Sequence, residues 1–193
     1  MKIFDQGLYH IYNRGNNHQP LFFREQDYNL FIELSIKNLA PRCHILAWCL
    51  MPNHFHFLLE INETSLERVI WGGNQMPAIT NGFQLLQSNY AKIINNRENR
   101  SGSLFQQKTK AKLLETIDYA VTAFWYIHQN PVKSSLVNNV EDWEYSSYKE
   151  YFGLRSGKLC NVDLGKSILD LSDVDFEPGS MIGYQEDILD GIF

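Results

Sequence analysis

The hydrophobic positions of this chain follow a two-residue period in some segments and a helical spacing in others. Four runs rich in aromatic and β-branched residues predict strands at 9–14, 43–50, 54–61 and 104–114. Apolar residues three and four positions apart predict helices over 25–39, 83–95 and 116–129. A further helix is expected to begin at Thr64, which has capping-box spacing to Glu67, and to be interrupted at Gly72-Gly73-Asn74. Thr116 has the side chain of a helix N-cap, and Asn130-Pro131 is expected to end the last helix.

The order of these elements is strand, helix, strand, strand, helix, strand, helix. The first six match the β-α-β-β-α-β order of a ferredoxin-like sheet. The sequence therefore predicts an α+β fold with an antiparallel sheet, an added last helix and a C-terminal extension. We expect one domain over 1–152 and an acidic extension over 153–193.

The composition is that of an ordinary globular protein, with 193 residues and 44% hydrophobic residues. No apolar stretch approaches the roughly 20 residues needed to cross a bilayer, and the N-terminus lacks the layout of a signal peptide. The three cysteines form no CxxC pair, which favours reduced thiols. These features predict a cytoplasmic protein with no membrane partner.

The charge is unevenly distributed along the chain, whose net charge is −5. Residues 163–193 carry eight acids and one base, whereas residues 92–112 carry six bases and one acid. A basic segment in a weakly basic body is compatible with a nucleic-acid partner, and a solvated charged face plus an acidic tail is the alternative.

Two histidines separated by one apolar residue open the third predicted strand. Side chains alternate along a strand, so His54 and His56 lie on one face while Phe55 lies on the other. Two neighbouring imidazoles can occupy two positions around one divalent metal. A purely structural role for the pair is the alternative.

The helix predicted over 116–129 offers a third ligand and a nucleophile. Tyr126 and Asn130 are four residues apart and share a face, on which Tyr119 also lies. A phenol can attack a phosphate, and an amide oxygen can bind a hard cation. Alternatively, Tyr126 is a core residue beside Phe124 and Trp125.

Other polar residues have weaker signals. Arg14 is expected to contact phosphate or to be an ordinary turn residue, and Glu60 to be a surface residue or a remote neighbour of the metal. His128 is expected at the surface, and other isolated histidines are expected to be structural or solvated. These are His10, His18 and His44. Three lysines at alternating positions are either a solvated strand face or phosphate contacts. They are Lys108, Lys110 and Lys112.

Five stretches, in order over about residues 8–152, together resemble the REP-associated branch of the single-tyrosine HUH transposases. They are 9–15 (YHIYNRG), 47–56 (AWCLMPNHFH), 101–106 (SGSLFQ), 126–133 (YIHQNPVK) and 143–148 (WEYSSY). The acidic tail is not part of this motif set, and the body is less basic than the resemblance leads one to expect.

The resemblance implies a ferredoxin-like enzyme that cuts and rejoins single-stranded, hairpin-forming DNA through a 5′-phosphotyrosine. His54 and His56 then bind Mg²⁺ or Mn²⁺, with Asn130 as third ligand and Tyr126 as nucleophile. The protein would act as a monomer or a homodimer. Two alternatives remain open from the residues, namely an inactive DNA-binding protein and a metal-dependent phosphoesterase that uses water.

Overall fold

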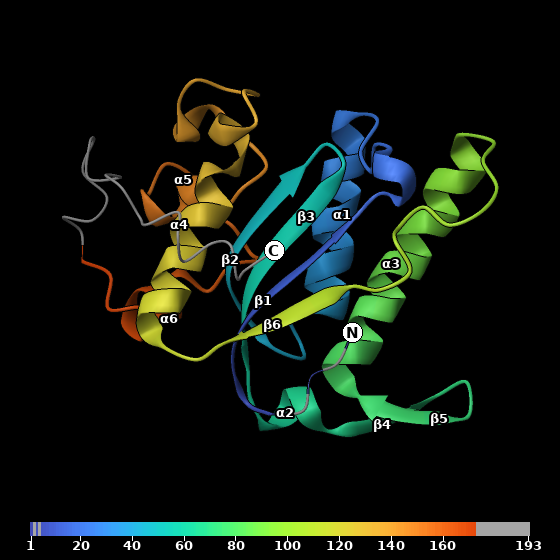
Figure 1. Ribbon diagram of the computed structural model, residues 1–193, viewed down its shortest axis with the longest axis horizontal. Coiled ribbons are helices and arrows are strands. Elements are labelled where there is room, and N and C mark those ends of the chain that lie inside the picture. Colours follow the sequence, from blue (N-terminus) through green and yellow to red (C-terminus); the bar gives the residue numbers. More distant parts are fainter. Residues whose placement is uncertain (2, 4, 173–193) are drawn as a thin grey trace.

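The central sheet has four strands in the order β2-β3-β1-β6, and every neighbouring pair is antiparallel (Figure 1). The computed structural model describes residues 1, 3 and 5–172. The strands are β1 (Gly7–Arg14), β2 (His44–Met51), β3 (His54–Ile61) and β6 (Lys110–Leu114). This arrangement confirms the predicted α+β fold and antiparallel sheet.

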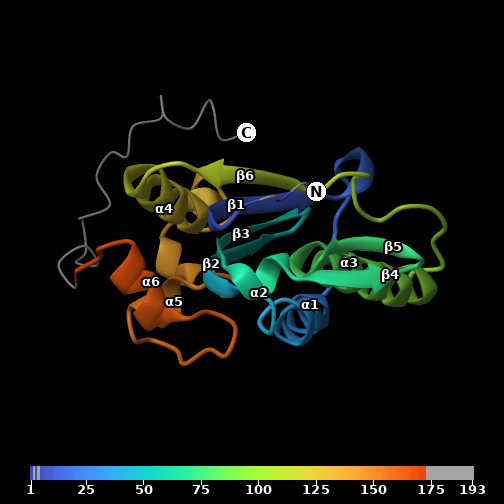
Figure 2. The same ribbon diagram turned by 90° about the horizontal axis from the view of Figure 1, so that it is seen from below.

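One face of the sheet, here called the aromatic face, packs against α1 (Glu25–Asn38) and α3 (Ala78–Arg97), as Figure 2 shows. Ile11, Phe55 and Phe57 point into this layer and are fully buried. Phe31 of α1 lies 5.3 Å from the Phe55 ring, measured between centroids. Burial of these large apolar side chains holds both helices against the sheet.

The opposite face, here called the histidine face, carries α4 (Ile117–Lys133). Small and apolar side chains of α4, including Ala120, Ala123 and Phe124, pack on β2 and β3. As predicted, Thr116 caps α4, and its hydroxyl accepts a 3.3 Å hydrogen bond from the Tyr119 amide.

The segment after α4 covers the outer edge of β2. The Leu50 amide donates to the Tyr145 carbonyl, and the Ser147 amide donates to the Trp48 carbonyl. A 3₁₀-helix η2 (Val140–Asp142) precedes this segment and α5 (Tyr148–Tyr151) follows it. Because the edge is paired, β2 cannot recruit another strand there.

Strand β2 has a register shift between Ile45 and Ala47, and the carbonyls of Ile45 and Leu46 accept hydrogen bonds from the later part of the chain. The Leu46 carbonyl accepts a 2.6 Å hydrogen bond from the Tyr151 hydroxyl, and the Asn161 amide donates to Ile45. Helix α6 (Val162–Ile168) follows. The proposed boundary at 152 stays a prediction, and residues 173–193 of the acidic tail lie outside the described residues.

The helix predicted over 83–95 is confirmed as part of α3, but the helix predicted to begin at Thr64 is only one turn long. Helix α2 (Glu63–Leu66) is a single turn that Asn62, rather than Thr64, caps. A hairpin of β4 (Arg68–Trp71) and β5 (Asn74–Pro77) follows. Gly72 and Gly73 both have positive φ, of 55° and 78°, which a tight hairpin turn requires and glycine tolerates.

Two predicted boundaries also need correction. Strand β6 begins at Lys110, because the preceding segment buries Leu104 and Phe105 as a loop against the core. Helix α4 continues through Pro131 to Lys133. A proline so near the C-terminus disturbs only the last turn, and the Ser134 amide still donates to the Asn130 carbonyl.

No helix of the described residues combines the length and the apolar character needed to cross a membrane.

Candidate active site

The β2–β3 hairpin and its neighbour β1 place the predicted histidine pair on the histidine face. His54 lies opposite Arg14 and His56 lies opposite Tyr12 in the register between β3 and β1. The two imidazole centroids are 4.9 Å apart, with His56 buried and His54 half-buried. Their side chains lie together, as the strand period predicted.

His56 makes a hydrogen bond to a third histidine. Its Nδ1 lies 2.9 Å from Nε2 of His10, which is fully buried on β1. Sequence reasoning expected His10 to be structural or solvated, and the structure shows the structural alternative. The contact was hidden by a sequence separation of 46 positions, although the pairing of β1 with β3 brings the two histidines side by side.

The turn between β2 and β3 orients the His54 ring. Its Nδ1 lies 2.6 Å from Oδ1 of Asn53, whose Nδ2 donates to the His18 carbonyl at 3.4 Å. His18 ends the 3₁₀-helix η1 (Asn16–His18), and Asn17 and His18 both have positive φ. The turn between β1 and α1 therefore lies against the His54 end of the site.

All three imidazoles are neutral near pH 7. Burial lowers the pKa of His54 to about 4, and the nearby Arg14 charge adds to the effect. Burial lowers the pKa of His10 to about 3, with a smaller contribution from Lys112. The pKa of His56 falls well below its usual value, also mainly through burial. A neutral imidazole has the nitrogen lone pair that a metal ion needs.

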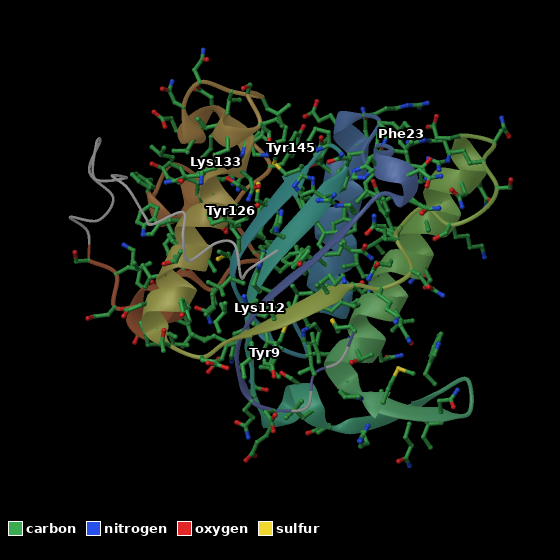
Figure 3. All side chains as sticks on the ribbon, in the orientation of Figure 1. Tyr9, Phe23, Lys112, Tyr126, Lys133 and Tyr145 are labelled. Carbon is green, nitrogen blue, oxygen red and sulfur yellow. The ribbon has the colours of Figure 1, made fainter. Side chains whose placement is uncertain are left out.

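Tyr126 of α4, labelled in Figure 3, contacts two residues of this histidine cluster. Its ring meets His56 edge-on, with 5.7 Å between centroids, and lies 6.2 Å from His10. Tyr126 is partly exposed, whereas Phe124 and Trp125 are fully buried in the core. One chain therefore brings the predicted nucleophile and the histidine pair together.

The environment of Tyr126 opposes ionisation of its hydroxyl. Burial raises its pKa to about 12, and the Asn130 side chain and the Arg14 charge partly offset that rise. The Lys133 ammonium lies 5.7 Å from the ring centroid. Deprotonation during a reaction would thus need a base or a further cation.

Asn130 lies one helical turn beyond Tyr126 and is buried. Its Nδ2 donates a 2.9 Å hydrogen bond to the Tyr126 carbonyl, which leaves Oδ1 as the atom suited to a cation. Within the described residues no three His, Cys, Asp or Glu side chains form a metal-binding group. Two imidazoles and an amide fit a metal that completes its shell with water and phosphate oxygens. The ligand role of Asn130 stays a prediction.

The four candidate DNA-binding residues lie on β6, at the end of β1 and in the loop before β6. Lys110 and Lys112 face Tyr12 and His10 across the β1–β6 ladder, so they share the histidine face. Arg14 lies 3.5 Å from His18 through its guanidinium. Lys108 precedes β6 and is outside that ladder.

The two arginines of the 92–112 segment interact with residues outside the histidine face. Arg97 binds Asp27 and Glu98, and Arg100 donates to Gln19 and lies over the Phe23 ring.

Three further predictions have outcomes in the structure. The surface position expected for His128 is wrong, because its ring is fully buried and Nε2 lies 2.8 Å from the Ser147 hydroxyl. Tyr119 is 42% exposed at the start of α4. Glu60 lies 3.9 Å from the solvated His44, at the far end of the strands from the histidine pair.

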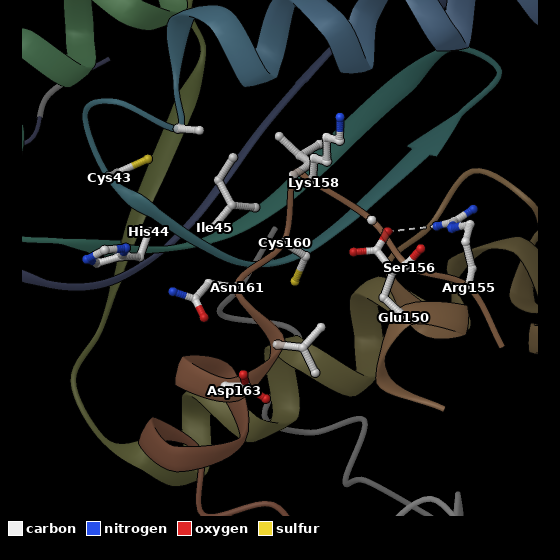
Figure 4. A pocket seen from close by; sticks show the side chains of 14 residues that line it. Cys43, His44, Ile45, Glu150, Arg155, Ser156, Lys158, Cys160, Asn161 and Asp163 are labelled. Atoms are coloured by element: carbon white, nitrogen blue, oxygen red, sulfur yellow. Dashed lines mark hydrogen bonds and ion pairs between the residues drawn. The ribbon is translucent and has the colours of Figure 1, made fainter. Parts of the chain in front are cut away.

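A separate polar cavity of about 490 Å³ lies between the start of β2 and residues 155–163 (Figure 4). Arg155 donates a 2.9 Å hydrogen bond to Glu150 on its wall. Glu150 also lies against Gly157, where a Cβ would meet its carboxylate at 2.4 Å. This close packing explains why residue 157 is glycine, and it indicates a structural role for the Arg155–Glu150 ion pair.

No family profile matches the chain. A curated protein of Haemophilus influenzae, described as "Putative REP-associated tyrosine transposase", is 26% identical over 103 residues, or 53% of this chain. The match spans 57% of that protein's length. The resemblance seen in the motifs is therefore confirmed at the level of a curated homologue.

A solved structure also matches, with a TM-score of 0.62 and 18% identity over 83% of this chain and 92% of the other. Its title is "Structure of the REP associates tyrosine transposase bound to a REP hairpin". At this identity the match establishes the fold, and it agrees with the predicted α+β class.

Proposed function

We propose that this protein is a REP-associated tyrosine transposase that cleaves and rejoins single-stranded, hairpin-forming DNA. The observation that supports the proposal most strongly is the edge-on contact between Tyr126 and His56 within one chain. A phenol from a helix and two neutral imidazoles from a strand are the parts that metal-assisted phosphoryl transfer needs.

In the proposed reaction the Tyr126 oxygen attacks the scissile phosphorus. The new bond joins phosphorus to the phenolic oxygen, and the bond from phosphorus to the 3′ oxygen breaks. The phenol gives up its proton, and the 3′ oxygen gains one and leaves as a hydroxyl. The phosphotyrosine keeps the phosphodiester energy, so a second 3′ hydroxyl can reverse the step and rejoin DNA.

The proposed cofactor is Mg²⁺ or Mn²⁺, with His54, His56 and Asn130 as the ligands. When bound, the ion would polarise the scissile phosphate and stabilise developing negative charge. Arg14 and Lys133 add positive charge near Tyr126, as the pKa contribution of Arg14 and the 5.7 Å contact with Lys133 indicate.

We infer the substrate from the basic residues on the histidine face. Lys110 and Lys112 lie on the same side of the sheet as Tyr12 and the histidines, where a DNA backbone would pass the site. Arg14 lies at the His54 end of the site, and we also assign Lys108 to this DNA-binding surface. The solved relative is titled as bound to a REP hairpin, which favours a hairpin substrate. A cytoplasmic location would suit such a substrate and remains part of the proposal.

The test is covalent capture of labelled hairpin DNA on a denaturing gel, with Mn²⁺ and with a chelator. The DNA is a pool that includes the repeats flanking the native gene. We expect a chelator-sensitive protein–DNA band that Tyr126→Phe abolishes. Tyr119→Phe is the matched control, because Tyr119 lies on the same helix but is exposed near its start.

The other outcomes assign a different function. Cleaved DNA without a covalent band, persisting in Tyr126→Phe, would indicate a phosphoesterase that uses water. Binding of hairpin DNA without cleavage across the pool would indicate a protein that keeps the fold but not the chemistry.

A further inference from the structure

Each histidine of the candidate metal pair has its Nδ1 atom engaged by another side chain of the protein. We propose that Asn53 and His10 are positioning residues that fix these histidines in the tautomer whose Nε2 lone pair faces the metal. The proposal rests on the metal-dependent function above, and it assigns roles to two residues that are not ligands.

For His54 the hydrogen-bond pattern determines the tautomer. Nδ2 of Asn53 donates to the His18 carbonyl, so Oδ1 of Asn53 faces Nδ1 of His54 at 2.6 Å. A carbonyl oxygen can only accept a hydrogen bond, so Nδ1 of His54 must carry the proton. Nε2 is then the unprotonated nitrogen, whether or not a metal is bound.

For His56 the partner is an imidazole, which can donate or accept. One proton is shared along the 2.9 Å contact between Nδ1 of His56 and Nε2 of His10. Nε2 of His56 is buried and has no hydrogen-bond partner among the described residues. A metal on this Nε2 would require its lone pair. The single proton of His56 would then be on Nδ1 and would donate to Nε2 of His10, whose own proton would be on its Nδ1.

The position of His10 is well fixed for this role. It lies on β1, its ring is nearly parallel to His56 at 13° and 5.1 Å, and it stacks on Tyr12 at 5.0 Å. Histidine ligands of metals usually donate their other N–H to a carboxylate, a carbonyl or water. Here Asn53 supplies an amide carbonyl and His10 a neutral ring nitrogen.

The first experiment is ¹⁵N NMR of the imidazoles in the metal-free protein and after addition of Mg²⁺. We expect His54 in the Nδ1–H tautomer in both samples, and His56 in the Nδ1–H tautomer once Mg²⁺ is bound. An Nε2–H tautomer for His54, or one retained by His56 at saturating Mg²⁺, would overturn the proposal.

The second experiment measures Mn²⁺ affinity without DNA, from the free-ion EPR signal. His10→Phe, which removes the acceptor, is expected to weaken binding about 10- to 100-fold. His10→Gln supplies an amide oxygen and should recover part of the loss. Asn53→Asp keeps an acceptor oxygen and should bind at least as tightly as the wild type, whereas Asn53→Ala should weaken binding.

His128→Gln is the matched control, because His128 is another fully buried histidine that makes its hydrogen bond through Nε2. It should leave the Mn²⁺ affinity unchanged. Wild-type affinity in a folded His10→Phe protein, checked by circular dichroism, would refute the role of His10.

Different results would contradict the proposed transposase function and the proposed positioning roles. If no covalent DNA adduct forms but the tautomers and Mn²⁺ affinities behave as expected, the transposase chemistry is wrong and the positioning roles stand. If the adduct forms and Tyr126→Phe abolishes it, but His54 is in the Nε2–H tautomer, the positioning roles are wrong.

Discussion

The two faces of the sheet differ in what their side chains do. The aromatic face is covered by α1 and α3, and the rings of Phe55 and Phe57 pack there against rings of both helices. On the histidine face, α4 packs mainly over β2 and β3. The imidazoles, the Tyr126 phenol, and Lys110 and Lys112 lie beside this contact, on α4 and on strands β3, β1 and β6. The comparison indicates that one face supplies stability so that the other can hold buried polar groups, which are costly to desolvate.

The most direct test of this division uses adjacent residues that point to opposite faces. Phe55→Ala should lower the free energy of unfolding by about 3–5 kcal/mol, because it leaves a cavity in the aromatic layer. His56→Ala should cost about 1–3 kcal/mol, since it removes the hydrogen bond between His56 and Nε2 of His10. Urea denaturation measures both, and an equal cost for the two variants would contradict the comparison.

The aromatic side also contains one buried charge, and its removal should affect stability alone. Asp27 of α1 is fully buried, pairs with Arg97 of α3, and accepts hydrogen bonds from the Phe23 and Arg24 amides. Asp27→Asn should lower the unfolding free energy by about 2–3 kcal/mol, because the ion pair between Asp27 and Arg97 is lost while Arg97 keeps only Glu98. The Mn²⁺ affinity of the histidine face should not change, and a coupled loss would show that the faces are not independent.

The same residue gives a pH test. Burial alone would raise the pKa of Asp27, but the Arg97 hydrogen bonds and the backbone amides outweigh it and lower the pKa. The stabilisation is therefore fully present above the unfolded pKa of about 4 and is lost as pH falls through the lower folded pKa. Denaturation of the wild type and Asp27→Asn should differ most above about pH 5 and converge in acid. A difference that grows in acid would reverse the sign we assign.

The smallest expected effect concerns DNA binding on the histidine face. Replacing Lys110 and Lys112 by alanine, in a Tyr126→Phe background that cannot cleave, should weaken hairpin binding several-fold. The slope of log affinity against log salt should fall by about 0.7 for each phosphate that the protein no longer neutralises. Lys92→Ala is the control, since Lys92 is exposed on α3 beside the aromatic face. An equal change in affinity and salt dependence for the control would show that Lys110 and Lys112 are not specific DNA contacts.

Local pattern was enough to predict much of the fold and part of the site. Alternation along a strand placed His54 and His56 together, and the four-residue spacing placed Tyr126 and Asn130 on one face of α4. Thr116 identified the start of α4 because capping depends on neighbouring residues only. The hairpin at 68–77 escaped prediction, because its short strands lack a strong period and Gly72-Gly73 also fits a break in a helix.

The sequence by itself determined which residues share a face, since strand and helix periods are local properties of the backbone. It could not determine which faces meet, because that depends on how elements far apart in the chain pack together. Only the tertiary structure placed His10 against His56, buried His128 against Ser147 and turned Tyr126 toward the histidines. The contact between His10 and His56 arises from the pairing of β1 with β3, whereas Tyr126 and His128 are placed by the burial of the apolar side chains of α4 on β2 and β3.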